Sequence, residues 1–325
     1  MKILVCGGAG YIGSHCVNLL KKQGFDYIVF DNLSEGHIEF VDKENFFKGD
    51  LQNVSDLRNC FAKYNGFDCV MHFSASCYVG ESVSNPQKYY KNNVMGTLNL
   101  LQVMLEFGVN KFIFSSTAAT FGNPEFIPID ENHSQKPINP YGMTKLMVEN
   151  ILKDYDTAYG LKHVVFRYFN ASGASSDSSI GEWHEPETHL IPLVLQTIKG
   201  EREKITVFGT DYKTDDGTCV RDYVHVDDIA QAHILGMKYL FSQNFSNSFN
   251  LGSQNGFSVK QIIDICEKVT GEKVNLEYGS RRPGDPDILI ASSKKIKELL
   301  NWNPINSDIE NIIQTAWKWE KSRNN

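Results

Sequence analysis

No apolar stretch of the 325-residue sequence approaches the roughly 20 residues that span a bilayer. The seven cysteines are scattered and include no C-x-x-C pair, which argues against both disulfides and zinc. There is no basic run and the net charge is −7, which argues against a nucleic-acid partner. Met1 leads directly into an expected strand, so we expect no signal peptide. These absences predict a soluble, cytoplasmic protein with neither a membrane nor a nucleic-acid partner.

The composition is that of a globular protein, with 41% hydrophobic and 22% charged residues. The length allows two domains or one large one. No internal repeat or low-complexity tract is found, so the architecture must be inferred from local patterns.

A glycine-rich turn joins an expected strand to an expected helix at the start of the chain. Ile3–Cys6 is a short apolar run, and apolar residues at helical spacing follow over 14–24. In a Rossmann turn, glycines placed like Gly7, Gly10 and Gly13 allow a tight bend, close approach of a pyrophosphate and close helix packing. The free N–H groups at the helix start would then face the phosphates.

An acidic residue ends the second expected strand, Tyr27–Phe30. Asp31 lies 18 residues beyond Gly13, where a carboxylate can accept hydrogen bonds from the adenosine ribose and repel a 2′-phosphate. The alternative is an ordinary glycine-rich turn between a strand and a helix. Strand, helix and acid together favour dinucleotide binding, and the acid favours NAD over NADP.

Strands and helices alternate along the first half of the chain. Further strands are expected at 45–48, 68–73, 111–114 and 163–166, with helices at about 55–64, at about 85–107 and from Tyr141. This alternation predicts a Rossmann-type doubly wound parallel sheet that binds ligands beyond the carboxyl ends of its strands. Residues that would share that edge are Gly10, Asp31, Asp50, Ser74 and Thr117.

Beyond about Asn170 the alternation breaks up. Residues 171–188 are expected to form a loop over the sheet edge, His189 to start a helix, and 218–228 to mix strand and loop. We predict an NAD-binding domain over 1–170 and a smaller C-terminal α/β substrate-binding domain over 171–325. A segment near 218–252 is expected to return to the first domain.

Three residues could carry acid–base chemistry. Tyr141 and Lys145 lie one helical turn apart, and Thr117 follows the fifth expected strand. A free phenol has a pKa of about 10, which an ammonium group and a cationic nicotinamide ring would both lower. Such a set can remove a proton from an alcohol while NAD⁺ accepts the hydride. The alternative is an exposed tyrosine beside a lysine, a pair that also occurs by chance.

Motifs along the whole chain match one known family. They are Gly7–Gly13, Asp31–Leu33, His72–Phe73, Val79–Ser82, Tyr89–Thr97, Phe112–Ser116, Pro140–Glu149, Arg167–Asn170, Gly217–Val226 and Asn250–Gly252. On these motifs the chain resembles the UDP-glucose 4-epimerases of the extended short-chain dehydrogenase/reductase family. The resemblance implies an NAD-dependent homodimer that inverts C4 of a UDP-hexose through a transient 4-keto sugar.

The resemblance also implies roles for individual residues. Tyr141 would be the base, Lys145 its electrostatic partner and a nicotinamide-ribose ligand, and Thr117 the family's Ser/Thr. Cofactor-binding residues are expected to be Gly7, Gly10, Tyr11, Ile12, Gly13, Asp31, Asn32, Asp50, Leu51, Phe73, Ser74, Asn92, Ser115, Tyr141, Lys145 and Tyr168. Substrate-binding residues are expected to be Thr117, Tyr141, Asn170, His189, Leu190, Arg221, Arg282, Asp285 and Leu289. No metal site is expected, and His72, His184 and His225 are taken as structural.

Some positions depart from the family pattern or have a second interpretation. Cys77 stands where some members carry a lysine that contacts the cofactor, and His189 replaces an asparagine. Leu289 replaces a tyrosine and should leave room for a 2-acetamido group, unless it is plain core packing. For Arg221 and Arg282 the alternative to a diphosphate contact is a surface ion pair.

Other activities stay open at this point. A nucleotide-sugar 4,6-dehydratase would place an Asp-Glu pair directly after the Ser/Thr, where this chain has Ala118 and Ala119. A decarboxylase of a related sugar is a weaker alternative. A non-catalytic NAD-binding sensor is the alternative from another class, but such proteins commonly lose the tyrosine or lysine that this chain keeps.

Overall fold

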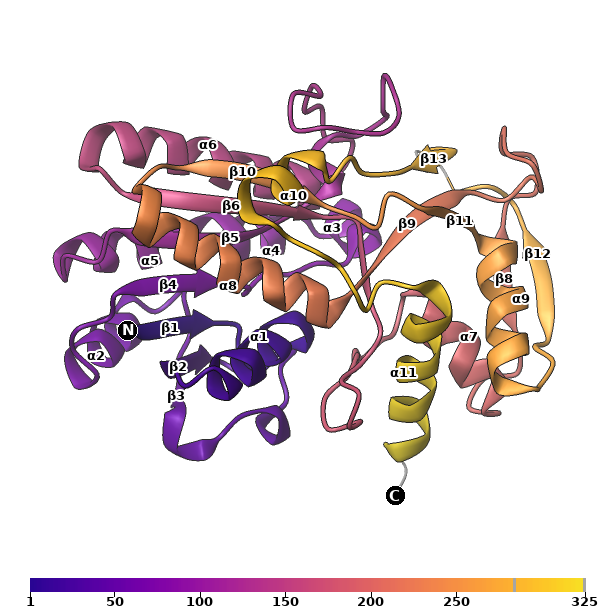
Figure 1. Cartoon of the computed structure of the whole chain (residues 1–325), viewed down its shortest axis with the longest axis horizontal. Coiled ribbons are helices and arrows are strands. Elements are labelled where there is room, and N and C mark those ends of the chain that lie inside the picture. The colour runs from indigo at the N-terminus through magenta and orange to yellow at the C-terminus, as the bar shows by residue number, and fades with distance from the viewer. Residues whose placement is uncertain (283–284, 324–325) are drawn as a thin grey trace.

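The computed structural model describes residues 1–282 and 285–323 and is built on a seven-stranded parallel sheet (Figure 1). The strand order is β10-β6-β5-β4-β1-β2-β3, and every neighbouring pair is parallel. The strands are β1 Lys2–Cys6, β2 Asp26–Asp31, β3 Phe46–Lys48, β4 Cys69–His72, β5 Lys111–Thr117, β6 Lys162–Tyr168 and β10 Asn247–Leu251. The predicted doubly wound Rossmann-type sheet is confirmed.

Alternation along the strands creates two cores, one on each face of the sheet. Ile3 and Val5 of β1 join one core with α1 (Tyr11–Lys22) and α8 (Val226–Gln243). Leu4 and Cys6 point the other way, into a core formed with α2 (Val54–Lys63), α5 (Gly96–Glu106) and α6 (Pro140–Tyr159). Strands buried on both faces explain the uninterrupted apolar runs in the sequence.

The helix expected over 85–107 is not a regular α-helix. It consists of α4 (Pro86–Tyr89), a π-helical segment (η3, Tyr90–Met95) and α5. Within the π segment, Asn93 accepts a hydrogen bond from Ser76 N at 2.8 Å and donates one to Ser76 O at 3.0 Å. The widened turn thereby holds the loop that follows β4, ahead of α3 (Val79–Ser84).

The C-terminal part contains smaller sheets covered by helices. One sheet has the order β11-β9-β13, with β7 also paired to β9, and β8 and β12 form a separate parallel pair. The strands are β7 Asn170–Ser172, β8 Ile205–Phe208, β9 Val220–His225, β11 Gly256–Ser258, β12 Leu276–Gly279 and β13 Ile288–Leu289. The helices are α7 Leu190–Ile198, α9 Val259–Thr270, α10 Lys294–Leu300 and α11 Ile309–Ser322; short 3₁₀ turns are η1 Ile38–Phe40, η2 Lys43–Asn45 and η4 Ala118–Thr120.

The expectation that 218–228 mixes strand and loop holds for residues 218–225 but is wrong for 226–228, which begin a helix. Strand β9 runs directly into α8, whose first turn carries Asp227 and Asp228. Carboxylates at that end favour a helix, and the His225 side chain accepts the Asp227 N–H at 3.1 Å as a cap. Helix α8 then packs on α1, and β10 pairs with β6. Residues 226–251 therefore lie with the first sheet.

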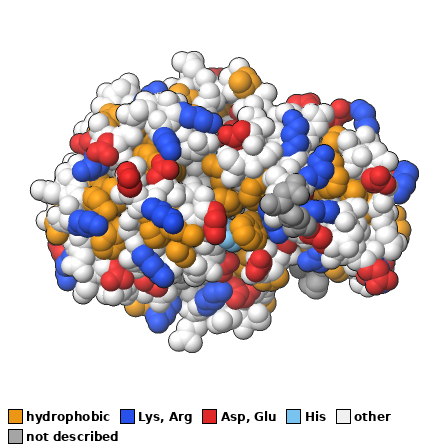
Figure 2. Space-filling model, turned by 90° about the horizontal axis from the view of Figure 1, so that it is seen from below, with side chains coloured by type: hydrophobic (Ala, Val, Ile, Leu, Met, Phe, Trp, Pro, Cys, Tyr) orange, Lys and Arg blue, Asp and Glu red, His pale blue; other side chains and the backbone are white. Residues whose placement is uncertain are grey.

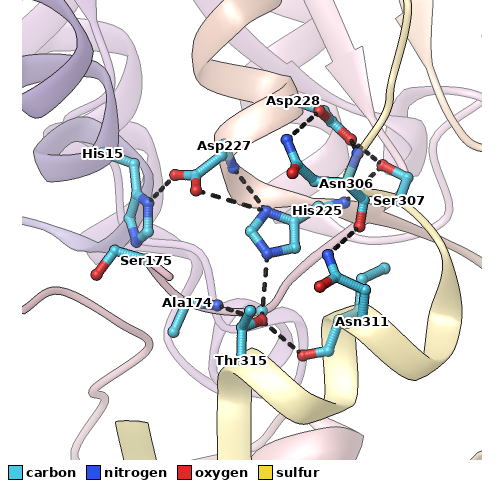
Figure 3. Close-up of polar contacts among 12 residues, drawn as sticks. His15, Ala174, Ser175, His225, Asp227, Asp228, Asn306, Ser307, Asn311 and Thr315 are labelled. Atoms are coloured by element: carbon cyan, nitrogen blue, oxygen red, sulfur yellow. Dashed lines mark hydrogen bonds and ion pairs between the residues drawn. The ribbon is translucent and has the colours of Figure 1, made fainter. Parts of the chain in front are cut away.

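A buried polar network joins the sheet to the C-terminal helix (Figure 3). His15 of α1 contacts Asp227 Oδ1 at 2.6 Å, and His225 Nε2 lies 3.2 Å from Thr315 Oγ1 of α11. The same Thr315 oxygen accepts the N–H of Ala174 at 3.2 Å. Burial lowers the pKa of His225 to about 4, so this histidine is neutral. This placement supports the structural role expected for it.

Figure 2 shows acidic and basic side chains interspersed over one face of the molecule, in keeping with a modest net charge of −7. Within residues 1–282 and 285–323, no helix combines the length and the apolar character needed to cross a membrane.

Candidate active site

A pocket of about 450 Å³ lies beyond the carboxyl ends of the parallel strands, between the sheet and the C-terminal part. Predicted site residues that line it are Gly7, Gly10, Tyr11, Ile12, Gly13, Phe73, Ser115, Thr117, Tyr141, Lys145, Tyr168, Asn170, His189, Arg221, Asp285 and Leu289. The topology thus brings together groups as far apart in the chain as Gly7 and Leu289.

The glycine-rich turn forms one wall of the pocket. A Cβ on Gly13 would lie 2.1 Å from Gly7 O, so only glycine lets α1 pack this closely on the turn. A Cβ on Gly10 would lie 3.5 Å from Gly7 O, its nearest neighbour among the described residues, which leaves an open cradle at the start of α1. In the part of the chain that the structure describes, no side chain caps that helix end. Its free N–H groups therefore suit an anionic group such as a pyrophosphate.

The residues expected around the adenosine lie outside the pocket. Asp31 is buried, and its carboxylate accepts the N–H groups of Ala9 at 3.1 Å and Leu33 at 2.9 Å. Asn32 donates to Asp50 Oδ2 at 3.1 Å. Burial raises the pKa of Asp31, while its backbone hydrogen bonds lower it. The Asp31 carboxylate therefore holds the glycine-rich turn in place through hydrogen bonds within the protein itself.

The start of α6 positions the reactive side chains. The Asn139 side chain accepts the Gly142 N–H at 2.8 Å and caps the helix. A Cβ on Gly142 would lie 2.4 Å from Ala119 O, so glycine is needed for α6 to approach the turn after Thr117. This close approach brings Tyr141 beside Thr117 at the end of β5, within hydrogen-bonding reach.

Burial dominates the electrostatics of the pair. It raises the pKa of Tyr141, with a further rise from Cys77, and the hydrogen bond with Thr117 opposes this shift. Burial lowers the pKa of Lys145 to about 8, against opposing contributions from Cys77 and Glu149. Within the protein the phenol therefore stays protonated at neutral pH. From the sequence we expected the pKa of Tyr141 to be lowered, but the protein's own side chains do not produce this lowering.

Comparison with known proteins identifies the family. The model of the NAD dependent epimerase/dehydratase family matches residues 3–252. The chain belongs to this family. A UDP-glucose 4-epimerase of Streptococcus mutans is 52% identical over 99% of this chain and 97% of its own length.

Solved structures agree. The UDP-glucose 4-epimerase from Brucella ovis in complex with NAD has a TM-score of 0.95 at 45% identity, covering 98% of this chain and 97% of that chain. The UDP-Glc/GlcNAc 4-epimerase from Campylobacter jejuni has a TM-score of 0.86 at 44% identity, covering 99% of each chain.

A buried ion pair that the sequence analysis missed supports the helix that carries Tyr141 and Lys145 in this member of the NAD-dependent epimerase/dehydratase family. Arg167 of β6 contacts Glu149 Oε2 at 2.7 Å, and Ser116 of β5 donates to Glu149 Oε1 at 2.5 Å. The side chains of Arg167 and Glu149 are only 4% and 1% exposed. Lys145, one turn earlier on α6, donates to Ser115 O at 2.7 Å. These bonds fix α6 against the ends of two strands.

The opposite wall carries the residues expected to hold a substrate. Arg221 donates to Val220 O at 2.7 Å and forms an ion pair with Asp285, which also accepts from Tyr212 at 3.1 Å. The predicted alternative for Arg221, an ion pair, is therefore present in the pocket itself. Leu289 packs against an apolar cluster of Ala118, Phe121 and Ile129, which Phe169 also borders.

Eight predicted residues do not line the pocket: Asp31, Asn32, Asp50, Leu51, Ser74, Asn92, Leu190 and Arg282. Ser74 N bonds to Cys6 O at 3.2 Å, and Asn92 donates to Ser76 Oγ at 3.1 Å. Arg282 lies over the Phe208 ring, 4.2 Å from its centroid. In the expected basic loop 281–285, Pro283 and Gly284 lie outside the described residues.

Four side chains from the loop between β7 and α7 form a cluster that sequence spacing did not reveal. Polar atoms of Glu182, His184, Glu187 and His189 all lie within 4.8 Å of one another. Burial lowers the pKa of His184, but its contacts with Glu182 and Glu187 raise it to about 9. The signal available in the sequence was the density of Glu and His between residues 182 and 189. The view of His184 as purely structural does not account for this arrangement.

Proposed function

We propose that this chain is an NAD-dependent UDP-glucose 4-epimerase, which inverts C4 of a UDP-hexose through a 4-keto sugar. The observation that carries the proposal is the meeting of Thr117, Tyr141 and Lys145 in one pocket with a dinucleotide-type glycine turn. The names of the S. mutans and B. ovis proteins support it.

The residues present fit NAD. The cradle at Gly10 and the open end of α1 would hold the pyrophosphate, and Lys145 would contact the nicotinamide ribose. When bound, NAD supplies a hydride acceptor that returns the hydride within the same cycle. Its cationic ring would also favour the phenolate of Tyr141 in a site where burial raises the pKa.

The chain's own residues would manage the proton. Tyr141 would accept the proton of the sugar 4-hydroxyl and later return it, with Thr117 hydrogen-bonded to the same oxygen. Lys145 carries its charge below a pKa of about 8 and would stabilise the phenolate. A 4,6-dehydratase needs an acid and a base after Thr117, where this chain has Ala118 and Ala119.

The nucleotide must stay anchored while the sugar turns. Asn170, His189, Leu190, Arg221 and Arg282 would hold the uridine diphosphate. Asp285 would meet the uridine ribose, but it now pairs with Arg221. Binding a diphosphate at Arg221 would therefore compete with this ion pair, because phosphate and carboxylate both accept from the same guanidinium donors.

Leu289 would set the size of the sugar pocket. It lines the cavity and borders an apolar cluster, so no hydroxyl narrows the wall at this point. We propose that the enzyme also accepts UDP-N-acetylhexosamines. The C. jejuni protein, named as a UDP-Glc/GlcNAc 4-epimerase, supports a dual specificity in a 44% identical relative.

We also propose a cytoplasmic homodimer. Exposed apolar side chains, Val83, Tyr90, Met95 and Met147, lie on α3, on the π segment and on α6, and α6 packs against both of the others. We propose this apolar exposure as the association surface. Light scattering during gel filtration should give twice the 36.8 kDa mass of one chain.

Incubation with UDP-galactose and with UDP-N-acetylgalactosamine, without added NAD, tests the activity. We expect the enzyme to copurify with NAD, to convert both substrates into their C4 epimers, and to release no stoichiometric NADH. Steady release of NADH would indicate a dehydrogenase, and failure with the N-acetyl substrate alone would refute only the wide pocket.

A further inference from the structure

The loop between β7 and α7 gathers two imidazoles and two carboxylates at the edge of the pocket. His189 Nδ1 lies 2.8 Å from Glu182 Oε1 and 2.9 Å from Glu187 Oε1. His184 Nδ1 lies 3.4 Å from Glu182 Oε1 and 3.5 Å from Glu187 Oε2. Four groups of these two types, converging from one short segment, are a donor set for a metal ion.

Two buried atoms of the cluster face each other as a loose ion pair. His184 Nδ1 and Glu187 Oε2 lie 3.5 Å apart and make no hydrogen bond with any other described residue. Buried polar atoms rarely stay unsatisfied, since each costs about 1–3 kcal/mol. Ligands held at about 2.0–2.1 Å in a tetrahedron are roughly 3.3–3.4 Å apart, close to the separations around His184.

The surroundings hold these side chains in place. Glu187 Oε1 accepts the backbone N–H groups of Thr188 at 2.7 Å and His189 at 2.8 Å. The rings of Tyr11 and Tyr78 pack edge-on against His184 at 6.2 and 6.1 Å. Such supporting contacts orient metal ligands before the ion binds.

The cluster also has an entry path. The His189 side chain is 45% exposed, whereas that of Glu187 is 3% exposed. Glu182, His184 and His189 all line the pocket, so an ion could enter from the side on which the substrate is expected. Binding through Nδ1 would leave Nε2 of His189 free to donate a hydrogen bond there.

We propose that Glu182, His184, Glu187 and His189 bind one divalent transition-metal ion, with Zn²⁺ as the preferred ion. Two nitrogen and two oxygen ligands suit the borderline character of zinc, whereas Mg²⁺ and Ca²⁺ prefer all-oxygen sites. The ion would cross-link four residues of the loop before α7 at the edge of the pocket. The site goes beyond the proposed epimerase activity and does not depend on it.

Zinc titration of the chelator-treated, NAD-loaded enzyme tests the site directly. Calorimetry with Zn²⁺ should give one ion per chain. Both Glu182→Gln and His184→Gln should weaken binding by at least 10- to 100-fold, the loss usual even for supporting residues. Glu185→Gln is the matched control, because Glu185 is an exposed carboxylate of the same loop that bonds to Trp183. It should leave zinc affinity unchanged.

The pocket thiol is the competing ligand. Cys77 lines the same cavity, so Cys77→Ser should bind zinc as wild type does. Cobalt in place of zinc should give a visible ligand-field spectrum without a sulfur-to-cobalt charge-transfer band, and this readout needs no variant that could fail to fold.

The site would be refuted if the wild-type enzyme did not bind zinc, or if the folded Glu182→Gln and His184→Gln variants kept the wild-type zinc affinity. Loss of zinc binding in Cys77→Ser, or a sulfur-to-cobalt charge-transfer band with cobalt, would refute it as well. Circular dichroism and retained NAD identify the folded variants. Epimerase turnover is measured separately, so an inactive enzyme that binds zinc refutes the proposed function and leaves the metal site intact.

Discussion

Replacing Lys145 by methionine measures how much a buried cation in the pocket lowers the free energy of unfolding. Burial lowers the pKa of this lysine from 10.5 to about 8. That difference corresponds to roughly 3 kcal/mol of unfolding free energy lost at pH 7, where both folded and unfolded chains are protonated. Methionine removes the charge, and the lost hydrogen bond to Ser115 O costs about 1 kcal/mol. The NAD-free variant should therefore be about 2 kcal/mol more stable than wild type.

The sign of the pH dependence makes the test specific. Because the pKa is lower in the folded state, the unfolded wild-type chain binds more protons between pH 8 and 10.5, and wild-type stability rises over that window. Urea unfolding at pH 7 and pH 10 should show an advantage of Lys145→Met at pH 7 that disappears by pH 10, while activity is lost.

Lys153→Met is the matched control, an exposed lysine of the same helix, and should change little at either pH. A Lys145→Met protein less stable than wild type at pH 7, or a difference that does not vary with pH, would refute the reasoning.

Other substitutions follow from the same geometry. Tyr141→Phe should fold and retain NAD but lose at least about 100-fold in turnover, and near-normal turnover would exclude Tyr141 as the base. Glu149→Gln should lower the free energy of unfolding in urea by roughly 3–5 kcal/mol, because Arg167 stays buried without its charge partner. Glu106→Gln, in the exposed pair with Arg58, should lower it by under about 1 kcal/mol. Equal losses in the two variants would contradict this account. Leu289→Tyr should suppress N-acetyl turnover by about 10–200-fold and largely spare UDP-galactose, and equal loss of both would show that Leu289 is not the gate.

The central sheet could be predicted because its strands are buried on both faces and its turns are marked by glycine and acid. The π-helical segment Tyr90–Met95 could not, since its apolar spacing resembles that of an α-helix. The start of α8 was missed because Asp227 and Asp228 look like loop residues until the His225 cap is known.

Parts of the site were predictable for a topological reason. Gly10, Thr117 and Tyr168 end strands or follow them, and parallel strands carry such residues to one edge. Contacts between side chains on separate elements could not be predicted. The pairing of Arg221 with Asp285 depends on how strand β9 meets the segment before β13, 64 positions further along, and no periodicity encodes that path.

The central claim is that C4 of the sugar gives a hydride to one bound NAD and then receives the same hydride back. Incubation of the purified enzyme with UDP-galactose deuterated at C4, without added NAD, tests it most directly. We predict UDP-glucose that retains the deuterium at C4, with no label in solvent or in free dinucleotide. Loss of the deuterium from the product, or its recovery in released NADH, would contradict the account.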